Sequence, residues 1–156
     1  MTEEKTIKVI ATNRRAWHDY HVLEKHEAGI VLCGTEVKSL RAGKASLVDS
    51  YASFNRGEAF VHNLLISPYE KANRFNHEER RPRKLLLHKQ EIGRLAGQVS
   101  QKGFTLVPLR LYFKGSHVKV ELGVVRGKKE YDKRHDLKER ETKREIDRVM
   151  RGRGAK

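Results

Sequence analysis

Cysteine and long apolar runs are scarce in this chain, and each scarcity excludes a class of protein. Cys33 is the single cysteine among 156 residues, which excludes an internal disulfide and a multi-cysteine zinc cluster. Apolar runs such as residues 30–33 and 64–66 are far shorter than the roughly 20 residues that a membrane-spanning helix needs. Residues 1–8 are charged and contain no apolar stretch, so they do not form a secretory signal. We therefore expect a cytoplasmic protein.

Sequence motifs for catalysis and metal binding are also lacking. The chain has no G-x-S-x-G, no phosphate-cradling glycine loop and no paired-carboxylate motif. His18, His21 and His26 fall in or next to a predicted strand, which would distribute them over both faces, and no compact set of other ligands completes a site. We expect no enzyme, no catalytic residue, no cofactor and no metal. An enzyme remains an alternative, because catalytic residues that are distant in sequence can come together in the folded chain.

Positive charge dominates the composition. The chain has 34 lysine and arginine residues against 20 aspartate and glutamate residues, a net charge of +14. Residues 126–156 contain 13 basic and 7 acidic residues, so residues 1–125 keep a net charge of +8. Nucleic acid is the commonest partner of such a chain, and an anionic membrane is the next candidate. The membrane alternative would need a strongly amphipathic basic helix, and we find no good one.

Apolar periodicity predicts a small, mainly β domain with helices over residues 1–125, either a barrel or a sheet. Residues 1–8 read as a frayed terminus. The run Asn55-Arg56-Gly57-Glu58 is typical of a hairpin turn between two strands. Predicted strands cover residues 18–25, 30–32, 48–54, 59–66, 104–113 and 117–125, and predicted helices cover 35–42 and 88–101.

Residues 126–156 read as a basic C-terminal tail. Their large aliphatic residues are only Leu137, Ile146, Val149 and Met150, which is too little apolar surface to offset the entropy of ordering. We predict that this tail is disordered in the free protein. The last three of these residues have helical spacing, so the tail could form a helix on a partner.

Two basic segments are candidates for RNA binding. Residues 67–84 combine several cations with Tyr69, and RNA-binding surfaces use cations to neutralise phosphates and aromatic rings to stack on unpaired bases. A solvated mobile loop fits the same composition. In the tail, Gly127 precedes a cationic run in which Tyr131 could stack on a base while Lys133 and Arg134 contact phosphates. A nonspecific basic tail is the alternative.

Several segments taken together resemble the SmpB family, the SsrA-binding proteins. The resemblance runs over essentially the whole chain. Its most specific parts are the long run at 34–44 and the tail motifs, in this order and spacing. The chain departs from the family pattern at Glu78-Glu79, where the family often has Asp-Pro. The matching runs are NRRA at 13–16, EAGI at 27–30, GTEVKSLRAGK at 34–44, RKLLL at 83–87, GKK at 127–129 and DKR at 132–134.

This resemblance implies an OB-fold-like antiparallel β-barrel with about three helices and a tail that is disordered in solution. It implies binding to the elbow of the tRNA-like part of transfer-messenger RNA, where the protein takes the place of the missing anticodon stem. The tail would enter the decoding centre and the empty messenger channel of a stalled ribosome and contact small-subunit RNA. Elongation factor Tu and alanyl-tRNA synthetase would be partners through the shared RNA.

The resemblance also implies roles for individual residues. Glu27, Leu86 and Lys119 would belong to the RNA-facing surface, although Leu86 could equally be a core residue. Glu27 would either accept hydrogen bonds from base amino groups or 2′-hydroxyls, or orient a nearby cation. The predicted RNA-binding residues are Glu27, Glu36, Lys38, Arg41, Lys44, Arg83, Lys84, Leu86, Lys119, Lys128 and Lys129. The predicted decoding-site residues of the tail are Tyr131, Asp132, Lys133 and Arg134.

Overall fold

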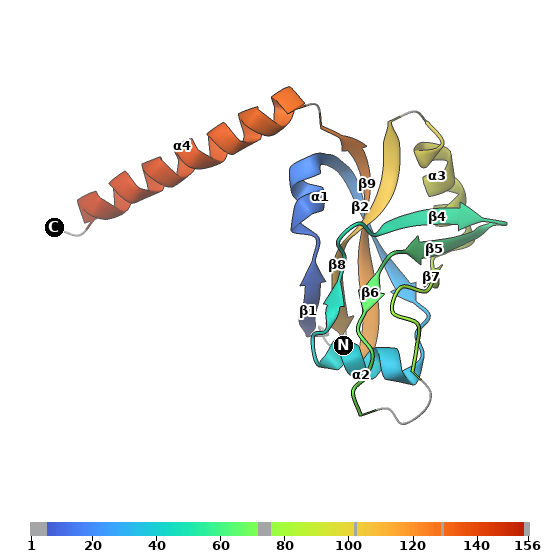
Figure 1. Cartoon of the computed structure of the whole chain (residues 1–156). Helices are drawn as coiled ribbons and strands as arrows, with labels where there is room; N and C mark the ends of the chain where they lie inside the picture. The colour runs from blue at the N-terminus through green and yellow to red at the C-terminus, as the bar shows by residue number, and fades with distance from the viewer. Residues whose placement is uncertain (1–5, 72–75, 102, 129, 155–156) are drawn as a thin grey trace, which may run out of the picture. The chain divides into compact units, whose positions relative to one another are not determined.

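The computed structural model describes the backbone of residues 6–71, 76–101, 103–128 and 130–154, and the side chains of these residues except 130–137 and 151–154. The chain divides into two units, Met1–Arg126 and Gly127–Lys156. The first unit is mainly antiparallel β-structure with three helices, and the second contains one helix (Figure 1).

Helices are interposed between strands along the chain. The strands are β1 (Ile7–Thr12), β2 (Tyr20–Ile30), β3 (Ala45–Ser46), β4 (Tyr51–Asn55), β5 (Glu58–His62), β6 (Leu65–Ile66), β7 (Arg83–Leu86), β8 (Phe104–Lys114) and β9 (His117–Gly127). The helices are α1 (Arg14–Asp19), α2 (Gly34–Arg41), α3 (Lys89–Val99) and α4 (Glu130–Gly154).

The main sheet has seven strands in the order β1-β8-β4-β5-β7-β2-β9, and β9 also pairs with β8. The pairings from β8 through β4, β5, β7, β2 and β9 therefore return to β8 and form a ring. The strand β1 pairs with β8 outside this ring, and β3 and β6 form a separate pair. The prediction of a mainly β fold with helices is confirmed.

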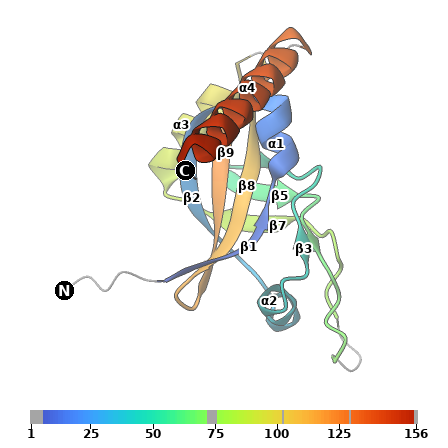
Figure 2. The same cartoon turned by 90° about the vertical axis from the view of Figure 1, so that its left-hand side faces the viewer.

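The core fills the inside of this ring. On strand β8, Leu106 and Leu111 are completely buried on either side of a register shift between Pro108 and Arg110, and Leu122 on the paired strand β9 is buried with them. Leu40 of α2 and Leu95 of α3 join the same cluster. Figure 1 and Figure 2 show α2 and α3 at opposite ends of this unit. The two helices therefore cover different ends of one apolar core.

The predicted hairpin is present and tight. Asn55 pairs with Glu58 across a two-residue turn. Both central residues have positive φ angles, 51° at Arg56 and 77° at Gly57. A turn with both central residues in this region matches the twist of the flanking strands.

Some elements were missing from the sequence prediction. Residues 1–8 were expected to be frayed, but β1 begins at Ile7. The helix α1 is too short for a periodic pattern, and its N-cap is Asn13, whose side chain accepts a hydrogen bond from the backbone N–H of Ala16 at 3.1 Å. The strand β7 was expected to be the end of a polar loop. This segment forms a strand because β5 pairs with it on one side and β2 on the other, and both are distant in sequence.

The tail segment contains the helix α4. We expected about three helices, and α4 makes a fourth in the described part of the chain. Disorder of the tail in the free protein stays a prediction. A helix satisfies its own backbone hydrogen bonds, and this segment is rich in Glu, Lys and Arg, which are strong helix formers. The spacing of Glu139 and Lys143 adds a favourable i,i+4 pair of opposite charges.

Candidate functional site

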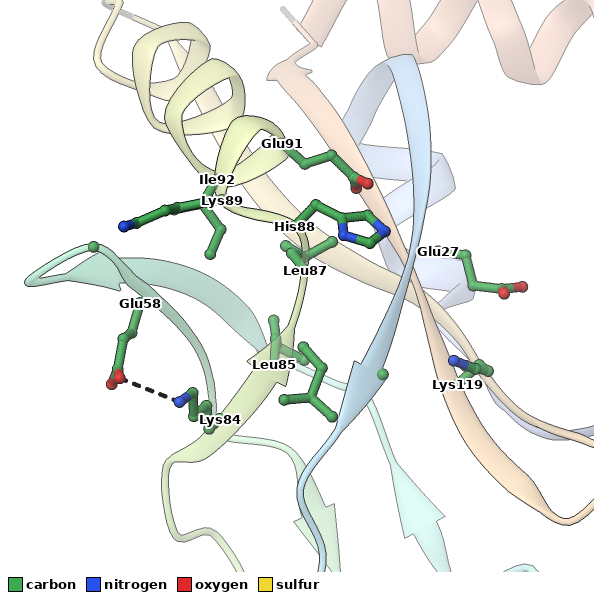
Figure 3. Close-up of a pocket in the computed structure, with 13 residues that line it drawn as sticks. Glu27, Glu58, Lys84, Leu85, Leu87, His88, Lys89, Glu91, Ile92 and Lys119 are labelled. Atoms are coloured by element: carbon green, nitrogen blue, oxygen red, sulfur yellow. Dashed lines mark hydrogen bonds and ion pairs between the residues drawn. The ribbon is translucent and has the colours of Figure 1, made fainter.

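A hollow of about 620 Å³ opens beside β2, β7 and the start of α3. Its floor comes from apolar residues of β7 and the segment after it, and its walls carry charged residues from four further elements. Figure 3 shows Glu27 and Lys119 on one side of β2, and Glu58, Lys84 and Lys89 on the other. The lining residues are Glu27, Gly29, Gly57, Glu58, Lys84, Leu85, Leu86, Leu87, His88, Lys89, Glu91, Ile92 and Lys119.

The apolar part of the hollow depends on a glycine. Gly29 of β2 pairs with Leu86 of β7. A Cβ atom added at Gly29 would lie only 3.1 Å from the Cβ of Leu86, a tight contact that would require Leu86 to shift by a few tenths of an ångström. Leu86 lies flat over this glycine and is 54% exposed. Leu86 is therefore not a core residue, whereas its neighbour Leu85 is buried in the core.

Glu27 is held by hydrogen bonds from residues of another strand. The Tyr112 hydroxyl donates to its Oε2 at 2.5 Å, and the Lys114 ammonium lies 3.2 Å from its Oε1. The Tyr112 hydrogen bond is the main reason that the pKa of Glu27 is lowered; partial burial opposes it, and Lys114 and Lys119 reinforce it. The structure thus gives Glu27 a cation to orient, which is one of the two roles considered from the sequence.

The cations of the hollow come from separate elements. Lys84 of β7 pairs with Glu58 of β5 at 3.1 Å, and both side chains are about half exposed. Lys119 of β9 is partly buried, and Lys89 begins α3. An exposed pair such as Lys84–Glu58 is weak and exchanges readily with other charged groups. Lys84 can therefore leave Glu58 for an anionic ligand at little cost.

Glu36 and Arg83 are placed differently from the expectation. Both were expected on the RNA-facing surface, but both side chains are completely buried and form an ion pair with each other. Arg81 donates a second hydrogen bond to Glu36 at 2.5 Å. Burial alone would raise the pKa of Glu36, but bonds from Arg81, the Cys33 backbone N–H and Arg83 outweigh it and lower that pKa to about 2.

The buried ion pair between Glu36 and Arg83 connects separate segments of the fold. Arg83 also donates to the backbone carbonyls of Leu64 at 2.7 Å and Glu79 at 3.2 Å. It therefore joins α2, through Glu36, to the residue before β6 and to the connection between β6 and β7. The side chains of Glu36 and Arg83 do not reach a ligand in this arrangement, so they shape the surface without contacting what binds there.

The remaining predicted cations of this unit lie away from the hollow. Lys38 of α2 lies over the ring of Tyr69, 5.4 Å from its centroid, and Lys44 pairs with Glu70 at 2.7 Å. Arg41 is exposed on the last turn of α2 beside Lys8. None of Lys38, Arg41 and Lys44 lines the hollow. They lie on α2 or just after it, at the other end of the core from α3 (Figure 1).

The predicted tail residues are only partly described. Lys128 is partly buried and has an interaction partner, and Lys129 lies outside the described residues. Tyr131, Asp132, Lys133 and Arg134 belong to α4, and their side chains also lie outside the described part.

The sequence prediction missed Gly29, Tyr112 and Lys114 as parts of the site. Gly29 had a signal, because a glycine inside a strand pattern often marks a close approach of another chain segment. Tyr112 and Lys114 had none, since their link to Glu27 joins residues 85 and 87 positions apart. Within the described residues we find no cluster of three or more His, Cys, Asp or Glu side chains arranged for a metal ion. No described helix is long and apolar enough to span a membrane.

Comparison with known proteins gives a consistent result over almost the whole chain. Residues 10–152 match the family described as "SmpB protein". The chain is 59% identical over 146 residues to the SsrA-binding protein of Carboxydothermus hydrogenoformans, covering 94% of this chain and 98% of that one. It is 59% identical over 153 residues to the SsrA-binding protein of Desulforamulus reducens, covering 97% and 95%.

A solved structure is similar as well. It is described as "tmRNA-SmpB: a journey to the center of the bacterial ribosome". The alignment has a TM-score of 0.66 and 58% sequence identity, and it covers 76% of this chain and 84% of that one.

Proposed function

Because the chain belongs to the SmpB family, we propose that it is a non-enzymatic RNA-binding protein that binds transfer-messenger RNA and brings it to stalled ribosomes for trans-translation. The reaction tags the nascent peptide and releases the ribosome. The similarity to SsrA-binding proteins spans 98% of one relative, so the proposal concerns the whole chain and not one shared module.

One observation of the structure supports this proposal most directly. Glu27, Leu86 and Lys119 are distant in sequence, and family resemblance assigned them to one RNA-facing surface. All three line the same hollow, together with Lys84. An exposed leucine next to two lysines suits RNA, because the apolar side chain can contact a base or sugar face while the cations neutralise phosphates.

The finer parts of the proposal concern fold and tail. We infer that the ring of strands serves as an OB-fold-like barrel that binds the elbow of the tRNA-like part. The tail would be disordered in the free protein and helical on the ribosome, in the decoding centre and messenger channel. Ile146, Val149 and Met150, which share one side of α4 by their spacing and are each more than half exposed, would then find a partner. Elongation factor Tu and alanyl-tRNA synthetase would act on the same RNA, in the cytoplasm.

The test is the identity of the bound RNA. The tagged full-length protein should be isolated from cells, and the RNA that accompanies it should be sequenced. We expect transfer-messenger RNA to be the dominant species. A ribosomal OB-fold protein would instead return ribosomal RNA fragments as its main species, and this result would overturn the proposal.

A further inference from the structure

Tyr112, Lys119 and Glu27 belong to three neighbouring strands. Tyr112 of β8 is directly opposite Lys119 of β9, and β9 is in turn the neighbour of β2, which carries Glu27. Adjacent strands are about 4.8 Å apart, so about 10 Å separates β8 from β2. The Tyr112 side chain crosses β9 to place its hydroxyl on the Glu27 carboxylate.

The tyrosine is itself firmly fixed. Tyr112 is only 3% exposed. The guanidinium of Arg110 lies over its ring, 5.3 Å from the centroid. Arg110 is in turn held by two hydrogen bonds to Oε2 of Glu121, at 2.6 Å and 3.1 Å. The Tyr112 hydroxyl is therefore a donor at a defined point of the surface.

The carboxylate that it holds keeps free acceptor capacity. An ionised carboxylate has about four lone-pair sites. Tyr112 and Lys114 occupy part of them, and the Glu27 side chain remains 38% exposed. Lys114 offsets the negative charge, which would otherwise repel phosphate. A free surface glutamate would spread over many rotamers, and ordering it on binding would cost side-chain entropy.

We propose that Tyr112 is a positioning residue of the RNA site, because its hydroxyl holds Glu27 with an open acceptor beside the Lys119 ammonium. Glu27 and Lys119 would together bind one nucleotide. Glu27 would accept a hydrogen bond from a 2′-hydroxyl or a base amino group, and Lys119 would neutralise the adjacent phosphate. Tyr112 does not touch the RNA. This inference rests on the proposed function, since it assumes that the hollow binds RNA.

The experiment is a double-mutant cycle on transfer-messenger RNA binding by the full-length protein. Tyr112→Phe should weaken binding about fivefold to tenfold, since it removes only the hydroxyl that preorganises Glu27. Glu27→Ala removes the acceptor and should weaken binding at least as much. In the Glu27→Ala background, Tyr112→Phe should have no further effect. The melting temperature should fall only slightly, because Glu27 is exposed enough for water to replace most of the lost bond.

A matched control and a direct readout complete the test. Tyr51→Phe removes a phenol hydroxyl from a ring that stacks on His62 outside the hollow, and it should leave affinity unchanged. In carboxyl-carbon NMR titrations, Tyr112→Phe should raise the pKa of Glu27 toward its ordinary value.

The outcomes separate the inference from the proposed function. If Lys119→Ala and Glu27→Ala both leave affinity unchanged, the hollow is not the RNA site, and both its proposed RNA binding and the positioning role of Tyr112 are wrong. If these two variants weaken binding and Tyr112→Phe does not, only the positioning role is wrong. If Tyr112→Phe weakens binding equally with and without Glu27, the tyrosine acts through the fold, and the inference is overturned.

Discussion

Replacing Glu36 with glutamine should destabilise the protein far more than any surface charge change. The substitution keeps the size of the side chain but leaves the completely buried Arg83 without its counter-charge. Removing one partner of a buried ion pair typically costs about 3–5 kcal/mol, because the remaining charge stays in a low-dielectric interior. Arg81 and the Cys33 backbone N–H also lose a charged acceptor. We expect a loss near the upper end of this range.

The assay is urea unfolding followed by circular dichroism, with Glu58→Gln as the matched control. Glu58 pairs with Lys84 at 3.1 Å, and both side chains are about half exposed. Such exposed pairs contribute about 0–1 kcal/mol. Equal losses for Glu36→Gln and Glu58→Gln would refute the reasoning, since burial would then make no difference to the pair.

The same carboxyl group gives a pH dependence with a definite sign. The pKa of Glu36 falls from 4.5 to about 2 on folding. The folded-state advantage is therefore complete above pH 4.5 and is lost as the pH falls toward about 2, because the unfolded chain takes up a proton first. Wild-type protein should lose free energy of unfolding between these pH values, and Glu36→Gln should lose distinctly less over the same interval.

Three predictions concern RNA binding and the tail. Binding should weaken steeply with salt, with a log–log slope on the order of −3 to −5 for about 4–6 phosphate contacts, and Lys119→Ala should reduce that slope by about one contact in a titration series. Truncation after Val125 should leave affinity for transfer-messenger RNA within roughly tenfold, and a much larger loss in a filter-binding assay would place the main RNA site in the tail. Replacing Asp132, Lys133 and Arg134 together with alanine should leave RNA binding near normal but almost abolish tagging on ribosomes stalled on a truncated message, since each lost charge-assisted contact costs roughly 1.5–3 kcal/mol. A variant with residues 131–134 scrambled has the same net charge, and normal tagging by it would support a nonspecific basic tail instead.

Local sequence patterns were sufficient to predict several elements of the fold. The hairpin turn at Arg56 and Gly57, the strand β9 and the helix α3 follow from turn residues and apolar periodicity, which act over a few positions. Family resemblance also rests on sequence alone, and it assigned Glu27, Leu86 and Lys119 to one surface. In the folded chain these three residues lie around one hollow.

Other features depended on contacts between distant segments. Glu36 and Arg83 both belong to charged, polar runs, and a charged side chain is ordinarily predicted to be exposed. They are buried because the fold brings together two charges that are 47 positions apart, and the surrounding carbonyls satisfy the remaining donors of Arg83. In the same way, the partner of Glu27 is a tyrosine two strands away in the sheet, 85 residues later in the chain. The sequence determined which residues are charged, and the pairing of distant strands decided which of those charges face water.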